Sequence, residues 1–215
     1  MKKTITIAAL TLTAVIAFAA YADAKTKVEE PKYQILQSLG RGIEIRQYGP
    51  RIVAEVEVTG SLDEARNSGF RTLAAYIFGK NIPAAKVAMT APVSAQAIGV
   101  SKDQAKIPMT APVTVQDDHG VWRIRFYMPA TYTMETIPKP SDQRIKLLEL
   151  KGEKLAVIRF SGTWNDDNFK HKETELKSLL TEKNIAYSGD AIKAHYNPPW
   201  TPTFWRRNEV LLAVN

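Results

Sequence analysis

The sequence predicts an α+β protein: a distorted antiparallel β-barrel or twisted sheet, built from two pseudo-symmetric ββαββ halves and covered by two helices. Three observations lead to this prediction. Short segments alternate apolar and polar residues, as half-buried strands do. Two longer segments combine a helical apolar stripe with an N-terminal cap. The segment 48–61 can also be laid over 150–163, which indicates an internal repeat.

The first 24 residues have the pattern of a secretory signal peptide. Two lysines precede an apolar run of about 17 residues, and Ala22-Asp23-Ala24 fits a small-x-small cleavage site. A transmembrane anchor is the alternative, but the run is short for a span and a cleavage site follows it. We therefore expect cleavage after Ala24, a location in the periplasm or outside the cell, and one mature domain over 25–215.

The mature chain begins with a lead-in over Pro31–Gly40, which is followed by two alternating segments. These segments are Gly42–Tyr48 and Arg51–Gly60, and the dipeptide Gly49-Pro50 between them is a turn signal. We therefore expect the two segments to pair with each other as a hairpin.

The residues Ser61-Leu62-Asp63-Glu64 have the form of a capping box. Ser61 can accept from the amide three residues on, while the Glu64 side chain reaches back. A helix is therefore expected to run to about Phe78. Its apolar stripe recurs at spacings of three and four residues, at Leu62, Ala65, Gly69, Leu73 and Tyr76.

The octapeptide KVAMTAPV at Lys86–Val93 is nearly repeated as KIPMTAPV at Lys106–Val113. We expect two similar strands that face each other across a turn near Gly99. Because proline cannot donate to a ladder, Pro92 and Pro112 should each lie at a sheet edge or a bulge.

After the doubled motif, a strand is expected over Val121–Met128 and a loop over Pro129–Asp142. The second half then repeats the order strand, then helix, at an offset of 102 residues. Its helix is expected over Asn165–Asn184, with the first residue as the cap and two acidic residues in the first turn. Two further strands are expected at Ala191–Tyr196 and Glu209–Val214.

The composition excludes several classes of function. The chain contains no cysteine, so thiol catalysis, disulfide exchange and cysteine-ligated metal sites are ruled out. The formal net charge is +7, but the basic residues are dispersed and form no run typical of a polyanion-binding tail. Together with export, this pattern argues against nucleic acid as a partner. We expect a monomer without a transmembrane segment once the signal peptide is removed.

Enzyme motifs are absent from the sequence: there is no HExxH, no GxSxG and no glycine-rich phosphate loop. The histidines His119, His171 and His195 suggest no catalytic or metal-binding arrangement, so no catalytic residue and no metal ligand is assigned. Met89 and Met109 occupy matching positions of the doubled motif. Their thioethers could hold copper(I) or a haem iron, or they could fill irregular space in the core.

The stretch Tyr196–Val210 combines three prolines with Trp200, Phe204 and Trp205, followed by two arginines. Aromatic rings can stack on a flat apolar ligand while arginines pair with its carboxylates. The alternative is a hydrophobic plug in which one of the arginines pairs with Glu209. Both interpretations remain open on the sequence alone.

Four motifs in order resemble the SOUL/haem-binding-protein family, and the match runs from about Tyr33 to Val214. The resemblance implies a distorted β-barrel of two ββαββ-like halves with two helices. It also implies non-enzymatic, non-covalent binding of haem or free porphyrin, as a carrier or buffer. The motifs are the doubled MTAPV segment, Phe126-Tyr127-Met128-Pro129, Arg159-Phe160-Ser161-Gly162 and the Tyr196–Val210 stretch.

The family's groove lies between the first helix and the C-terminal strands, with basic residues near the propionates. The positions aligned with those basic residues are Asn67, Ala75 and Thr201, so neighbouring arginines are expected to take their place. No histidine falls on a family motif, which favours apolar burial and propionate pairing over iron coordination. An apolar small molecule or a lipid is the alternative ligand, and an uncharacterised enzyme is a further alternative. The expected ligand-binding residues are Arg66, Phe70, Arg71, Met89, Met109, Tyr196, Trp200, Phe204 and Arg206.

Overall fold

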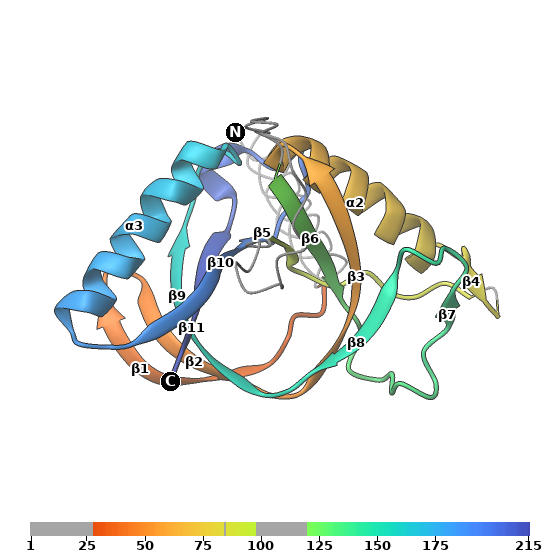
Figure 1. The fold of residues 1–215 in the computed structure, drawn as a ribbon, viewed down its shortest axis with the longest axis horizontal. Helices are drawn as coiled ribbons and strands as arrows, with labels where there is room; N and C mark the ends of the chain where they lie inside the picture. The colour runs from red at the N-terminus through yellow and green to blue at the C-terminus, as the bar shows by residue number, and fades with distance from the viewer. Residues whose placement is uncertain (1–27, 84, 98–119) are drawn as a thin grey trace, which may run out of the picture.

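The computed structural model describes residues 28–83, 85–97 and 120–215, which form a large antiparallel sheet and two α-helices (Figure 1). This confirms the predicted α+β class. The helices are α2 (Leu62–Ile77) and α3 (Asp166–Glu182), with a short 3-10 helix η1 at Thr203–Trp205. The strands are β1 (Tyr33–Gly40), β2 (Ile43–Tyr48), β3 (Arg51–Gly60), β4 (Asn81–Ile82), β5 (Val93–Ala97), β6 (Gly120–Tyr127), β7 (Lys139–Pro140), β8 (Lys146–Leu150), β9 (Glu153–Phe160), β10 (Tyr187–His195) and β11 (Asn208–Val214).

The strand order in the large sheet is β1-β2-β9-β11-β10-β5-β6-β3-β8, and every neighbouring pair is antiparallel. The sheet curves beneath the two helices, with α3 over β9 and β11 and α2 over β3 and β6 (Figure 1). Within the described residues no ladder joins the two end strands β1 and β8, so closure into a barrel is not confirmed.

Both helices begin where their caps predict. The Ser61 hydroxyl accepts from the Glu64 amide at 3.4 Å, and the Ser61 amide donates to the Glu64 carboxylate at 3.0 Å, which completes the capping box. In α3 the side chain of Asn165 accepts from the Asn168 amide at 3.3 Å. Gly69 lets α2 approach β6 closely, because a β-carbon there would lie 2.5 Å from Ile124 Cγ1.

The expected hairpin between Gly42–Tyr48 and Arg51–Gly60 is wrong. Instead, β2 pairs with β1 on one side and with β9 on the other. The strand β3 pairs with β6 and β8. The segment treated as a lead-in is therefore a strand, and the true hairpin is β1–β2. The physical reason is that alternation identifies a half-buried strand but not its partner, so two successive alternating segments need not pair with each other.

The first copy of the doubled motif was expected to form a strand, and this expectation is wrong. Residues Lys86–Met89 have no regular structure, and β5 begins only at Val93, directly after Pro92. Proline has no amide hydrogen for the ladder, so pairing starts beyond it. The second copy lies outside the described residues, and so does the expected pairing between Met89 and Met109.

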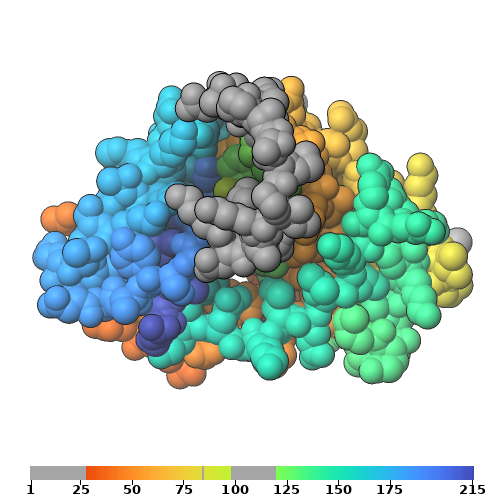
Figure 2. All heavy atoms as spheres, in the orientation of Figure 1, coloured from red at the N-terminus to blue at the C-terminus, as the bar shows by residue number. Residues whose placement is uncertain are grey.

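Three apolar clusters hold the sheet and helices together. One lies between α2 and the strands β3 and β6 and includes Leu73, Tyr76 and Phe126. A second lies between α3 and the strands β9 and β11 and includes Phe169 and Leu176. The third lies on the opposite face of the sheet and includes Tyr48, Leu155, Val157, Ala194 and Leu211. In the space-filling view, α3 and the C-terminal strands occupy the left of the molecule and β4 projects at its right edge (Figure 2).

None of the helices in the described parts of the chain is long and apolar enough to cross a membrane.

Candidate functional site

Two predicted ligand-binding arginines, one on α2 and one in the loop before β11, meet on the same aromatic ring. The guanidinium carbon of Arg206 lies 4.4 Å from the ring centroid of Trp164, and that of Arg66 lies 5.5 Å from it. Arg66 also donates through Nη1 to the Trp164 carbonyl at 3.2 Å. The ends of both helices and the C-terminal loop are thus brought together at this indole.

Trp164 is held in place by its own hydrogen bond. It lies between β9 and the cap of α3, and its indole Nε1–H donates to Asn208 Oδ1 at 2.9 Å. Asn208 is fully buried and donates in turn to the Gly162 carbonyl at 3.3 Å. Trp164 is held by hydrogen bonds at its indole nitrogen and at its carbonyl oxygen. Its ring therefore offers the two guanidiniums a defined surface for cation–π contact.

The C-terminal loop presents aromatic side chains to solvent. Trp200 is 84% exposed, Phe204 68% and Trp205 71%. Arg206 keeps this loop in shape, since it donates to the carbonyls of Pro199 at 2.7 Å and Thr201 at 2.8 Å. The exposed rings therefore form an apolar surface on a braced loop rather than a buried hydrophobic plug. The other part of that alternative is confirmed, because Arg207 pairs with Glu209 at 3.0 Å.

On α2, Phe70 is 38% exposed and packs edge-on against Phe126, with the ring centroids 5.4 Å apart. Arg71 follows it and is exposed. Met89 is 38% exposed and lies in the irregular segment before β5. Met109 lies outside the described residues.

Tyr196 does not join this group, because it belongs to the face of the sheet that lies away from the helices. Its hydroxyl donates to the Glu209 carboxylate at 2.6 Å, and the Arg207 guanidinium lies 3.8 Å from its ring centroid. Burial, and then the nearby charge of Glu209, raise the pKa of the Tyr196 phenol far above its usual range. The side chain is thus committed to a buried ionic network that also contains Arg46.

His195 is the residue that sequence reasoning missed. It is 5% exposed, and neither ring nitrogen has a hydrogen-bond partner in the described structure. Its ring packs edge-on against Trp164 at 5.2 Å and Phe169 at 4.9 Å. Burial, and then the positive charges of Arg66, Lys193 and Arg206, together lower the pKa of His195 to about 3. The sequence signal that could have found His195 is its place at the end of an alternating strand, two residues after Lys193, which is also buried.

The sequence model of the SOUL heme-binding protein family matches residues 28–213. The chain belongs to the SOUL haem-binding protein family. Its relatives include Heme-binding protein 1 of Mus musculus, which is 30% identical over 162 residues covering 74% of this chain and 77% of the mouse protein. Heme-binding protein 1 of Bos taurus is also 30% identical over 162 residues, covering 74% of this chain and 76% of the bovine protein.

This member of the SOUL family also shares its fold with solved structures of low sequence identity. An uncharacterised conserved protein from Listeria innocua has a TM-score of 0.59 at 12% identity, covering 81% of this chain and 93% of that one. The EcmrR C-terminal domain has a TM-score of 0.56 at 8% identity, covering 85% and 98%. A hydrolase from Listeria innocua has a TM-score of 0.53 at 12% identity, covering 81% and 92%. These likenesses establish the fold alone.

We call the group formed by Arg66, Trp164, Trp200, Phe204 and Arg206 the α2–loop site. In this SOUL family member, the site offers stacking surfaces and cations rather than metal ligands. Trp164, Trp200 and Phe204 provide aromatic surface, while Arg206 provides positive charge. Arg66 adds a guanidinium whose charge is partly compensated by Asp63 at 2.8 Å. Across the described residues, no cluster of three or more His, Asp or Glu side chains could hold a metal ion. The arrangement can therefore bind a flat apolar molecule that carries negative charge.

Proposed function

We propose that the chain binds haem or a related tetrapyrrole, non-covalently, on the surface formed by α2, Trp164 and the C-terminal loop. The observation that carries this proposal is the convergence of Arg66 and Arg206 on the fixed ring of Trp164, beside the exposed aromatic loop. Rings stack on the macrocycle, and guanidiniums pair with its propionates. Membership of the family, and relatives named as heme-binding proteins, support the same ligand.

The residues present fit a tetrapyrrole held by its ring and its carboxylates rather than by its iron. His195 packs edge-on against Trp164, but both of its ring nitrogens are buried. Binding through apolar burial then gives an affinity near micromolar, since ordering and association costs offset much of the burial free energy. Haemin and the metal-free ring should bind within about tenfold of each other.

The chain acts in this proposal as a carrier or buffer, not as an enzyme. The imidazole of His195 has its pKa lowered to about 3 and no hydroxyl or carboxylate hydrogen-bonded to it in the described structure, which makes it a poor general base. Export after cleavage at Ala24, a monomeric state, a single mature domain over 25–215 and the absence of a nucleic-acid partner belong to the same proposal.

The two halves are proposed to be related by a pseudo-two-fold axis, with the ligand site where they meet. In one half the order β5-β6-β3 flanks α2, and in the other the order β10-β11-β9 flanks α3. Trp164 leads into the helix of the second half, and Arg66 belongs to the helix of the first. An experimental structure in which Arg51–Ile77 and Glu153–Glu182 superpose poorly would contradict this relation.

The test is a Soret titration of the mature chain with haemin and with metal-free protoporphyrin. Trp200→Ala is the sharpest variant, because a side chain that is 84% exposed can be removed without loss of packing. We expect it, and Arg206→Ala, to weaken both ligands by about 5- to 100-fold. Arg144→Ala removes an exposed arginine that is bonded to Asp142, and should change neither affinity.

Two outcomes would contradict the proposal. Undiminished binding in both the Trp200 and Arg206 variants would place the ligand elsewhere. A several-hundredfold preference for haemin, abolished by replacing one histidine or methionine, would show that the iron is ligated.

A further inference from the structure

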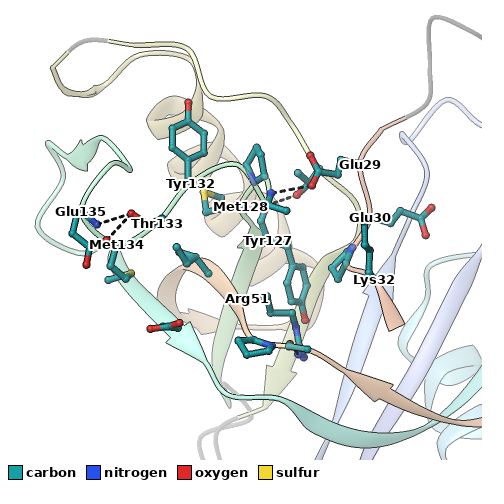
Figure 3. A pocket seen from close by; sticks show the side chains of 18 residues that line it. Glu29, Glu30, Lys32, Arg51, Tyr127, Met128, Tyr132, Thr133, Met134 and Glu135 are labelled. Carbon is teal, nitrogen blue, oxygen red and sulfur yellow. Dashed lines mark hydrogen bonds between the residues drawn. The ribbon is translucent and has the colours of Figure 1, made fainter. Parts of the chain in front are cut away.

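A cavity lies away from the α2–loop site, and the proposed function does not use it. It has a volume of about 400 Å³ and is formed by the segment before β1, the turn between β2 and β3, the end of β8, and the loop after β6. This volume falls within the range of small-molecule sites. We call it the acidic cavity, and Figure 3 shows its lining. Its lining residues are Glu29, Glu30, Pro31, Lys32, Gly49, Pro50, Arg51, Ile52, Thr90, Tyr127, Met128, Pro129, Ala130, Tyr132, Thr133, Met134, Glu135 and Glu149.

The walls of the acidic cavity are held by hydrogen bonds that backbone amides donate. The Ala130 amide donates to the Glu29 carboxylate at 2.9 Å, which ties the loop after β6 to the segment before β1. The Met128 amide donates to the Ile52 carbonyl at 2.9 Å. The rim at Thr133 is a turn closed by hydrogen bonds to Thr136. A cavity braced in this way is preformed and loses little entropy when a ligand enters.

The floor and sides of the cavity are largely apolar. Met128 and Ile52 are buried, while Met134 is 40% exposed at the rim. Methionine adapts to the shape of an apolar group and makes favourable contacts with aromatic rings. The rings of Tyr127 and Tyr132 add aromatic surface, and in Figure 3 they extend to opposite sides of Met128.

The charge that remains at the rim is negative. The lining contains four glutamates, one lysine and one arginine. Two of these charges are already paired with residues outside the cavity: Arg51 with Glu153 at 2.5 Å, and Glu30 with Arg207 at 2.9 Å. Three carboxylates then stand against one ammonium group. They are Glu29, Glu135 and Glu149, opposite Lys32.

One further detail favours a cationic ligand. The Thr133 hydroxyl donates to the Glu135 carboxylate at 2.5 Å, which lowers the pKa of this carboxyl and favours its ionised form. Arg51 does not offset this charge, because its side chain is nine-tenths buried in the wall and is already paired with Glu153.

We propose that the acidic cavity binds an organic cation, namely a protonated or quaternary amine that carries an apolar group. The apolar group occupies the floor between the methionines and tyrosines, and the cationic head faces the carboxylates at the rim. This ligand differs in charge from the tetrapyrrole proposed for the α2–loop site, so the two sites have opposite electrostatic preferences.

The experiment compares two probes of similar size and opposite charge, phenylbutyltrimethylammonium and phenylpentanoate, by saturation-transfer NMR titration of the mature chain. We expect the cation to bind and the anion to bind at least tenfold more weakly, with cation binding reduced when salt rises from about 50 mM to about 500 mM. The variants Glu135→Gln and Glu149→Gln should each weaken the cation about two- to fivefold, because each removes one exposed charge. Glu182→Gln, an exposed carboxylate on α3, is the matched control and should have no effect.

A cavity-filling variant makes the test independent of charge. Ala130 lines the cavity, is exposed and donates only through its backbone, so Ala130→Phe should block the probe while the circular dichroism spectrum stays unchanged. Haemin binding should be unaffected in this variant, which separates this proposal from the proposed function. Equal or tighter binding of the anion, no binding of either probe, or displacement of the cation by haemin would each overturn the proposal.

Discussion

The burial of His195 predicts a specific dependence of stability on pH. Its pKa is about 3 in the folded chain, against an ordinary value of 6.5 when the residue is exposed by unfolding. Between these two values the unfolded chain binds a proton that the folded chain does not. Stability is therefore complete above pH 6.5 and falls progressively as the pH is lowered towards 3.

The size of the stability loss depends on how far the pH lies below the pKa of His195 in the unfolded chain. Each pKa unit is worth about 1.36 kcal/mol, so at pH 4.5, two units below, His195 alone costs about 2.7 kcal/mol. A domain of this size has a total stability of about 5–15 kcal/mol. One imidazole thus removes a measurable fraction of the total over a pH range in which the fold should still be intact.

The assay is urea unfolding of the wild type and of His195→Leu at pH 7.5, 6, 5 and 4.5, at constant ionic strength. Leucine fills the space against Trp164 and Phe169 without a titrating group, and it removes two buried nitrogens that lack partners. The carboxylates titrate equally in both proteins, so they cancel in the difference. The stability of the variant minus that of the wild type should grow by about 2–3 kcal/mol from pH 7.5 to pH 4.5.

A control and a refuting result complete this test. His171 is exposed on α3, so His171→Gln should leave the wild-type pH profile unchanged. If His195→Leu and the wild type lose stability in parallel as the pH falls, then the imidazole takes up its proton in the folded state and the burial argument is wrong.

Four further substitutions test the helix–sheet packing, the buried ion-pair network and the helix caps. Gly69→Ala should destabilise the fold by about 1–3 kcal/mol, since the new β-carbon would lie 2.5 Å from Ile124 Cγ1; an unchanged melting temperature would mean that α2 can move away from β6. Glu209→Gln should cost about 3–5 kcal/mol in urea unfolding, because the buried Arg46 and the half-buried Arg207 lose their shared counter-charge. A loss below about 1 kcal/mol would show that the network is no better than a surface pair. Ser61→Ala should cost about 1 kcal/mol through loss of the capping box, with a comparable loss for Asn165→Ala and no change in ligand affinity for Ser61→Ala.

The helices could be read from the sequence because their signals are local. A capping box at Ser61 and an asparagine cap at Asn165 mark starts that need no knowledge of the rest of the chain. The sheet could not be read in the same way. Tyr33–Gly40 is an edge strand that is exposed almost throughout, so it shows no alternation and the sequence predicts only a lead-in there. Its partner Gly42–Tyr48 is predicted to pair with Arg51–Gly60 instead, because alternation identifies a strand but not its neighbour.

The residues of the candidate site also differ in whether the sequence could predict them. Arg66 and Arg206 could be predicted because charge on a helix face and in a proline-rich loop is visible in the sequence. Trp164 and His195 could not, since their importance comes from contacts between segments far apart in the chain. Tyr196 was grouped with the ligand residues by its nearness in sequence to Trp200, but it lies on the opposite face of the sheet.

The strand order has a consequence for how the protein is made. On the ribosome, β3 is complete long before β8, yet Arg51 pairs with Leu150, and Ile43 in β2 pairs with Ile158 in β9. The nascent N-terminal half thus emerges with hydrogen-bonding edges that have no partner until most of the chain has been synthesised. Such distant pairings fold slowly and expose strand edges to other chains in the meantime. A fragment that ends before β8 should therefore aggregate or be degraded rather than persist as an independent half.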